Sequence, residues 1–121
     1  MYRATTIFLL ATTLLAIIVF IKLPSNHMYE LHFQSGFNNE SIDIYGINED
    51  KLSIDAKTDY TISLADVIEF VHKDSAEIRI SIPEHDIEHK IRLSIKSPYV
   101  LISLVEGNIE IEFTDAAPGY L

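Results

Sequence analysis

The sequence of 121 residues contains no cysteine, which excludes disulfide bonds, thiolate nucleophiles and cysteine-ligated zinc. Its four glycines are isolated from one another, so no glycine-rich loop could hold a phosphate group. Any domain in this chain must therefore be held together by its hydrophobic core alone. The part that follows residue 26 has roughly 95 residues, enough for one such core and not for two.

Basic residues are scarce as well, with nine lysines and arginines against 18 aspartates and glutamates. Arg3 and Lys22 flank an apolar segment near the start of the chain, so only seven basic residues remain in the part that holds every acidic one. That part carries a net charge of about −11. Nucleic acid and anionic membrane surfaces repel such a charge, and no nucleic-acid partner is expected.

The apolar segment spans residues 4–21 and contains no charged residue, proline or glycine. As a helix it would be about 27 Å long, close to the thickness of the hydrocarbon layer of a membrane. It is longer than the core of a signal peptide, and no pair of small residues that would mark a cleavage site follows it. We therefore expect a retained transmembrane signal anchor over residues 4–22. Cleavage near Ser25 or Asn26 is the alternative.

The charges that flank this segment predict its orientation. The amino terminus and Arg3 precede it, and Lys22 alone follows it, which favours a cytoplasmic N-terminus and a periplasmic or extracellular domain in a single-pass membrane protein. The chain then divides into a cytoplasmic N-terminus (1–3), the anchor (4–22), a linker (23–27), a folded domain (28–114) and a C-terminal tail (115–121).

Past residue 26, apolar and polar residues alternate, as in strands with one buried face. This alternation predicts strands over 29–33, 42–44, 52–54, 60–64, 78–82, 91–95 and 109–113, with a short turn at 63–66. Residues 99–105 are apolar on both faces, which favours a central strand covered on two sides; a strand next to a partner surface is the alternative. Seven to nine short strands separated by turn residues predict an all-β fold, a single small antiparallel β-sandwich.

One short motif has the appearance of a metal site. His85, Glu88 and His89 match the H-x-x-E-H pattern in which two histidines bind zinc and the glutamate acts as a base. That chemistry needs a helix, but Pro83 precedes the motif and a strand pattern follows it. On a strand, two histidines four residues apart lie about 13 Å from each other. A polar hairpin connection is therefore the favoured interpretation. We expect no cofactor and no catalytic residues, and these three remain the candidate metal ligands.

Exposed aromatic residues give a third possibility. Tyr45 and Tyr99 lie at outward positions of predicted strands, where tyrosine can bind a carbohydrate or a protein. The tail at 115–121 ends on two apolar residues, and it either folds back on the domain or docks elsewhere.

Two stretches of the sequence, residues 32–44 and 63–70, resemble small prealbumin-like β-sandwich modules. Those modules are compact extracytoplasmic domains used for structure, carbohydrate contact or partner binding. The resemblance covers residues 28–113 and implies the same sandwich fold. It carries over no functional residue, because it includes no diagnostic motif.

These observations favour a membrane-tethered, non-enzymatic interaction or assembly module that binds a protein partner and is attached through residues 4–22. A metal-binding or hydrolytic domain that uses His85, Glu88 and His89 is one alternative. A carbohydrate-binding module that uses surface aromatics is the other.

Overall fold

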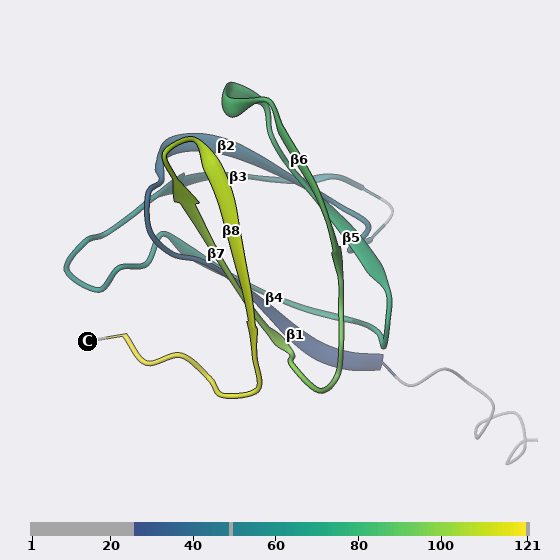
Figure 1. Cartoon of the computed structure of the whole chain (residues 1–121). Coiled ribbons are helices and arrows are strands. Elements are labelled where there is room, and N and C mark those ends of the chain that lie inside the picture. Colours follow the sequence, from purple (N-terminus) through teal and green to yellow (C-terminus); the bar gives the residue numbers. More distant parts are fainter. Residues whose placement is uncertain (1–25, 49, 121) are drawn as a thin grey trace, which may run out of the picture.

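A computed structural model describes residues 26–48 and 50–120, which form eight β-strands and one short 3-10 helix. The strands lie in two four-stranded sheets that pack face to face (Figure 1). We call the sheet with the order β4-β1-β7-β8 sheet A, and the sheet with the order β3-β2-β5-β6 sheet B. The elements are β1 (Asn26–Phe33), β2 (Asn38–Tyr45), β3 (Leu52–Lys57), β4 (Asp66–Lys73), β5 (Glu77–Ile82), η1 (Pro83–His85), β6 (Ile87–Arg92), β7 (Tyr99–Val105) and β8 (Asn108–Thr114).

The all-β sandwich predicted from the sequence is confirmed. One pairing differs from the antiparallel arrangement we expected, because β1 and β7 pair in parallel. Successive strands run up and down the sandwich, so the first and the seventh have the same direction. They become neighbours only when the chain returns to sheet A. A local alternation pattern contains no information on such a distant pairing.

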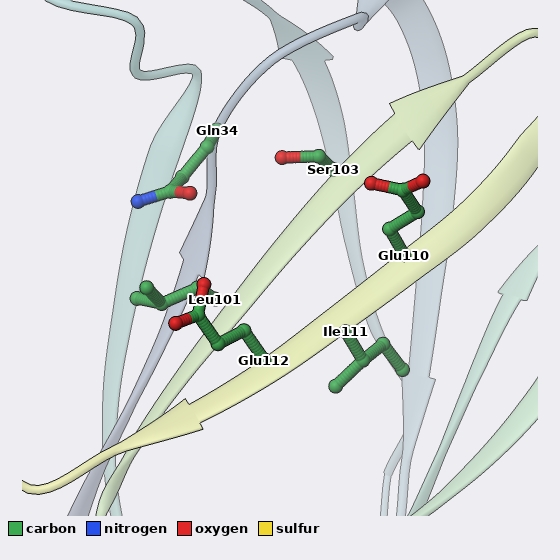
Figure 2. Close-up of a pocket in the computed structure, with 6 residues that line it drawn as sticks. All are labelled: Gln34, Leu101, Ser103, Glu110, Ile111 and Glu112. Carbon is green, nitrogen blue, oxygen red and sulfur yellow. The ribbon is translucent and has the colours of Figure 1, made fainter.

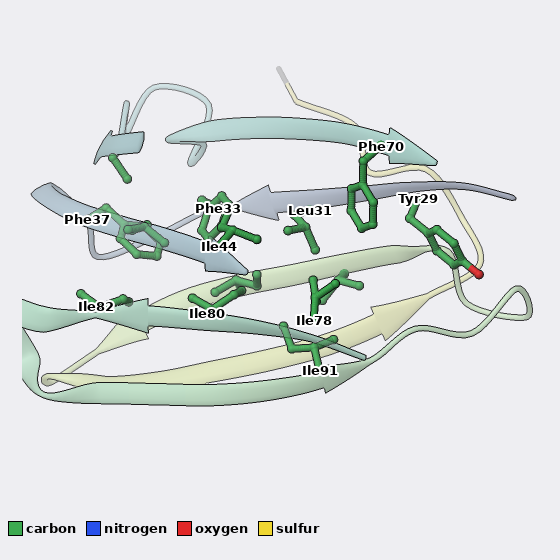
Figure 3. Packing of buried hydrophobic residues seen from close by; sticks show 14 of the residues in the cluster. Tyr29, Leu31, Phe33, Phe37, Ile44, Phe70, Ile78, Ile80, Ile82 and Ile91 are labelled. Atoms are coloured by element: carbon green, nitrogen blue, oxygen red, sulfur yellow. The ribbon is translucent and has the colours of Figure 1, made fainter. Parts of the chain in front are cut away.

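The core lies between the two sheets, and alternate residues of each strand fill it (Figure 3). Leu31, Ile44, Ile80 and Ile102 are among the side chains with no exposed surface. Each large aliphatic side chain buried in this way contributes roughly 1.5–3 kcal/mol to the stability of the fold. The period-two pattern of the sequence therefore provides the core that a chain without disulfides requires.

Aromatic side chains fill the two ends of the core. Tyr29 stacks on Phe70 with 5.7 Å between the ring centres, and Phe33 meets Phe37 edge to face at 5.8 Å. The Tyr29 hydroxyl donates a hydrogen bond to the carbonyl oxygen of Lys73. Burial raises the pKa of Tyr29, and the nearby negative charge of Asp74 raises it further.

The prediction of a strand over residues 60–64 is wrong, and the strand lies at β4 instead. Residues 60–63 form a turn, which Asp59 closes through its backbone pairing with Leu64. The side-chain oxygen of Asp59 also accepts a hydrogen bond from the Thr61 backbone, and Tyr60 is largely exposed. The alternation of β4 is hidden because Val67 and Val71 occupy its outward positions, so that both of its faces contain apolar residues.

Other strand boundaries shift by a few residues. β1 begins at Asn26, so the last two residues of the expected linker belong to it. β6 begins at Ile87 and ends at Arg92, earlier than the predicted 91–95. Glu106 and Gly107 both have positive φ angles, as a two-residue hairpin turn between β7 and β8 requires.

The predicted anchor at 4–22 lies outside the described residues. Within 26–48 and 50–120, no helix is long and apolar enough to cross a membrane.

The connection between β1 and β2 passes very close to β7. Gly36 has a φ angle of +89°, and a Cβ atom placed on it would lie 1.7 Å from the carbonyl oxygen of Leu104. The backbone N–H of Leu104 donates a hydrogen bond to the carbonyl oxygen of Ser35, which holds this approach in place. Only glycine fits here, because both the backbone angle and the missing side chain are needed.

Candidate functional site

The outer face of sheet B contains as many basic as acidic side chains. Its strands direct four carboxylates and four bases outward, namely Asp43, Asp55, Glu77 and Glu88 with Lys57, Arg79, Lys90 and Arg92. Lys51 lies 3.8 Å from the Asp43 carboxylate, and Arg79 lies 3.8 Å from Glu88. Such exposed pairs contribute little energy, and this face is a solvated surface with charges of both signs.

The outer face of sheet A has a different composition. It also contains four carboxylates, Glu30, Glu69, Glu110 and Glu112, but the only lysine or arginine that its described strands direct outward is Lys73, at the end of β4. Glu30 and Glu69 stand directly opposite each other across β1 and β4, and like charges in that position are destabilising. Five outward side chains of these strands are aliphatic or methionine, and two of them, Val67 and Leu101, lie in the same row of the face as Glu112; the others are Met28, Val71 and Val105.

A hollow of about 350 Å³ opens on this face of sheet A (Figure 2). Glu110 and Glu112 line it from β8, while Leu101 and Ser103 line it from β7. Gln34, just after β1, lines the opposite side. Ile111 of β8 completes the lining, so the hollow combines two carboxylates and two neutral polar groups with two apolar side chains.

The C-terminal tail crosses the same face and is fixed there by Tyr120. The Tyr120 hydroxyl lies 2.7 Å from Nδ1 of His32 and accepts a hydrogen bond from the side-chain amide of Gln34 at 3.0 Å. The rings of His32 and Tyr120 stack, with 5.6 Å between their centres. Nε2 of His32 lies 3.0 Å from a carboxylate oxygen of Glu30. Each donor in this series of hydrogen bonds faces an acceptor when Nε2 of His32 carries the proton.

This network accounts for a buried polar residue that the sequence did not single out. His32 is only 4% exposed although it points to the outer face of sheet A, because Tyr120 and Tyr99 cover its ring. Of the two fates considered for the tail, folding back on the domain is the one observed.

The structure does not gather the candidate metal ligands into one cluster. His85 lies in η1 beside the β7–β8 turn, and Glu88 faces Arg79 on the outer face of sheet B. His89 pairs with Ile80 and therefore lies on the opposite side of β6 from Glu88. Among residues 26–48 and 50–120, no group of three or more histidine and carboxylate side chains could hold a metal ion.

The two tyrosines considered for carbohydrate binding lie on opposite sides of the molecule. Tyr45 is on the outer face of sheet B, where the Arg79 guanidinium sits 4.3 Å above its ring. Tyr99 is on the outer face of sheet A and meets His32 edge to face at 6.2 Å. The two rings therefore do not form one aromatic platform.

The sequence reasoning missed the outer face of sheet A as a site. A signal was present, since Val67, Val71 and Leu101 are apolar residues at positions that a half-buried strand would fill with polar ones. No protein-family model and no curated protein matches this chain. The candidate site therefore stands on its geometry and charge.

Proposed function

We propose that this protein is a membrane-tethered, non-enzymatic interaction module that binds a basic protein partner outside the cytoplasm through the outer face of sheet A. The observation that carries the proposal is the difference in charge between the two outer faces. The four carboxylates on the outer face of sheet A share it with one lysine and no arginine, whereas the four on sheet B share theirs with four lysine and arginine side chains.

The chemistry of the hollow supports a lysine or arginine side chain as the main contact. The aliphatic stem of such a residue would pack against Leu101, and its charged end would reach Glu110 and Glu112. Gln34 and Ser103 would offer further polar contacts. Because these groups lie near the surface, binding should weaken as the salt concentration rises.

The tether rests on the sequence. The apolar run at 4–21 has the length of a membrane span, and the bias of the flanking charges favours a domain outside the cytoplasm. Retention of the full chain in membranes after washing with alkaline carbonate tests the tether, and protease digestion of intact cells tests the orientation.

Site-specific cross-linking tests the binding face. Ser103 on sheet A and Ser81 on sheet B are both half-buried outward serines, so they form a matched pair. A photoreactive residue at Ser103 of the full chain, in its native membrane, should cross-link a single partner, and the yield should fall with salt. The same residue at Ser81 should not.

Equal cross-linking at Ser103 and Ser81, or none at either position under low salt, would contradict the proposed face. A cross-linked product that carries an acidic rather than a basic segment would contradict the proposed partner chemistry. Binding of a metal through His85, Glu88 and His89, or of a glycan through Tyr45 or Tyr99, remains a prediction that no described contact favours.

A further inference from the structure

The exposed apolar side chains are unevenly distributed over the sandwich. Four of the six large ones lie near one end, where β1 begins, β4 and β8 end, and β6 connects to β7: Met28, Val71, Ile95 and Phe113. We call this the N-proximal end; Figure 1 shows it at the bottom of the view, opposite η1 and the β7–β8 turn. Met28 and Val71 are directly paired and are 58% and 51% exposed.

The N-proximal end is also the end nearest the proposed anchor. Three residues separate Lys22 from the start of β1 at Asn26. Four peptide units span at most about 14 Å even when fully extended. The polar layer on each side of a bilayer is several ångströms thick, so a domain on this linker must stand at the membrane surface with its N-proximal end foremost.

The two ends of the sandwich also differ in net charge, and the N-proximal end is the less negative one. The connections at each end, with the strand residues that border them, contain five acidic residues. Four basic residues accompany them at the N-proximal end: Lys51, Lys73, Arg92 and Lys96. At the opposite end Lys57 is the only one. The net negative charge that would repel a membrane is therefore concentrated away from the N-proximal end.

From the exposed side chains, the linker length and this charge distribution, we infer that the N-proximal end docks onto the surface of the bilayer, with Ile95 and Phe113 seated among the lipid headgroups. The inference rests on the tether of the proposed function. Docking removes apolar surface from water and fixes the orientation of the domain. The strands then run away from the membrane, and the outer face of sheet A remains open to a partner.

The absence of cysteine allows a direct test, because one introduced cysteine takes a spin label at one defined position. Ile95 and Val105 form a matched pair, since both are β-branched, they are 46% and 41% exposed, and they lie near opposite ends of the sandwich. Full chains with Ile95→Cys, Phe113→Cys or Val105→Cys are labelled and inserted into phosphatidylcholine vesicles. Collision rates with a water-soluble nickel complex and with oxygen are then measured for each.

We expect the labels at 95 and 113 to collide several-fold less often with the nickel complex than the label at 105, and more often with oxygen, which concentrates in lipid. Equal rates at all three positions, in protein that floats with the vesicles, would overturn the docking and leave the tether intact. Protein that does not float with the vesicles would overturn the tether, and the docking with it. The label at 113 provides a second reading if Ile95→Cys disturbs the β6–β7 connection.

Discussion

The outer faces of the two sheets contain the same number of carboxylates but place them in different surroundings. On sheet B each carboxylate shares the face with a basic residue, and Lys51 and Arg79 lie within 4 Å of two of them. On sheet A the carboxylates have one lysine among them, apolar side chains between them, and the C-terminal tail beside them. One sandwich thus combines a solvated face of balanced charge with a face on which carboxylates outnumber lysine and arginine.

The difference shows that sheet A is the sheet destabilised by its own charges. Two glutamates directly opposite each other on β1 and β4 weaken sheet A, and a lysine in either position would relieve the repulsion. Sheet B contains such a pair of opposite sign, since Glu77 stands opposite Arg92. Its one pair of like charges, Arg79 opposite Lys90, has the Glu88 carboxylate 3.8 Å from Arg79. The excess of negative charge on sheet A is the observation on which the proposal of a basic partner rests.

The largest expected effect is a destabilisation of the whole sandwich, including both outer faces. Gly36→Ala would force a side chain into the backbone of Leu104 and strain a positive φ angle, so we expect a loss of about 3 kcal/mol or more in the free energy of unfolding. Denaturant unfolding measures it. Gly119→Ala, which meets no atom within 4 Å, is the matched control and should leave stability unchanged. A small loss in Gly36→Ala would mean that β1 and β7 are less closely joined than described.

The next effect concerns sheet A alone. Tyr120→Ala removes the ring that stacks on His32 and the hydroxyl that contacts His32 and Gln34, and we expect a loss of about 2 kcal/mol. Tyr120→Phe keeps the stacking and should lose about half as much. Tm values of the full chain in detergent would show this order. If both variants have the same Tm as the wild type, the tail does not stabilise this face.

A smaller change in stability is expected to have opposite signs on the two faces. Glu69→Gln relieves the repulsion with Glu30 and should raise the stability by about 0.5 kcal/mol at low salt. Glu88→Gln removes the partner of Arg79 on sheet B and should lower it slightly. High salt should reduce both differences. A loss of stability in Glu69→Gln would show that the carboxylates of sheet A are not in conflict.

The smallest effect is expected from metals. Because His85, Glu88 and His89 point to different parts of the surface, excess zinc should leave the Tm of the full chain unchanged. A ligand at about 100 times its dissociation constant would add roughly 2.7 kcal/mol and raise the Tm by several degrees. A rise that disappears in His85→Ala would restore the metal-binding alternative.

The sequence predicts most of the fold because period-two alternation depends only on near neighbours. It places the core residues of β1, β2 and β5 correctly, and it places β7 inside its sheet. The expectation that both faces of β7 are covered is wrong, because Val105 is exposed and Leu101 lines the hollow on the outer face. It fails at β4, where apolar residues on both faces conceal the alternation, and at residues 60–64, where an alternating run forms a turn.

The candidate site could not be predicted in the same way. Whether Glu110 shares a face with Glu30 or with Glu88 depends on which sheet β8 joins, and that follows from contacts between strands far apart in the sequence. The burial of His32 depends on Tyr120, which lies 88 residues further along the chain. Outward apolar residues such as Leu101 were the available signal.

The most direct test of the binding face is a charge reversal on each sheet. Full chains with Glu110→Lys and Glu112→Lys on sheet A, or Asp55→Lys and Glu88→Lys on sheet B, are purified from native membranes, and the recovered partner is quantified. Both pairs change the net charge equally, so only the position of the charge differs. We predict that the partner is lost from the sheet A variant and kept by the sheet B variant. Equal recovery from both variants would contradict the assignment of the outer face of sheet A as the binding surface.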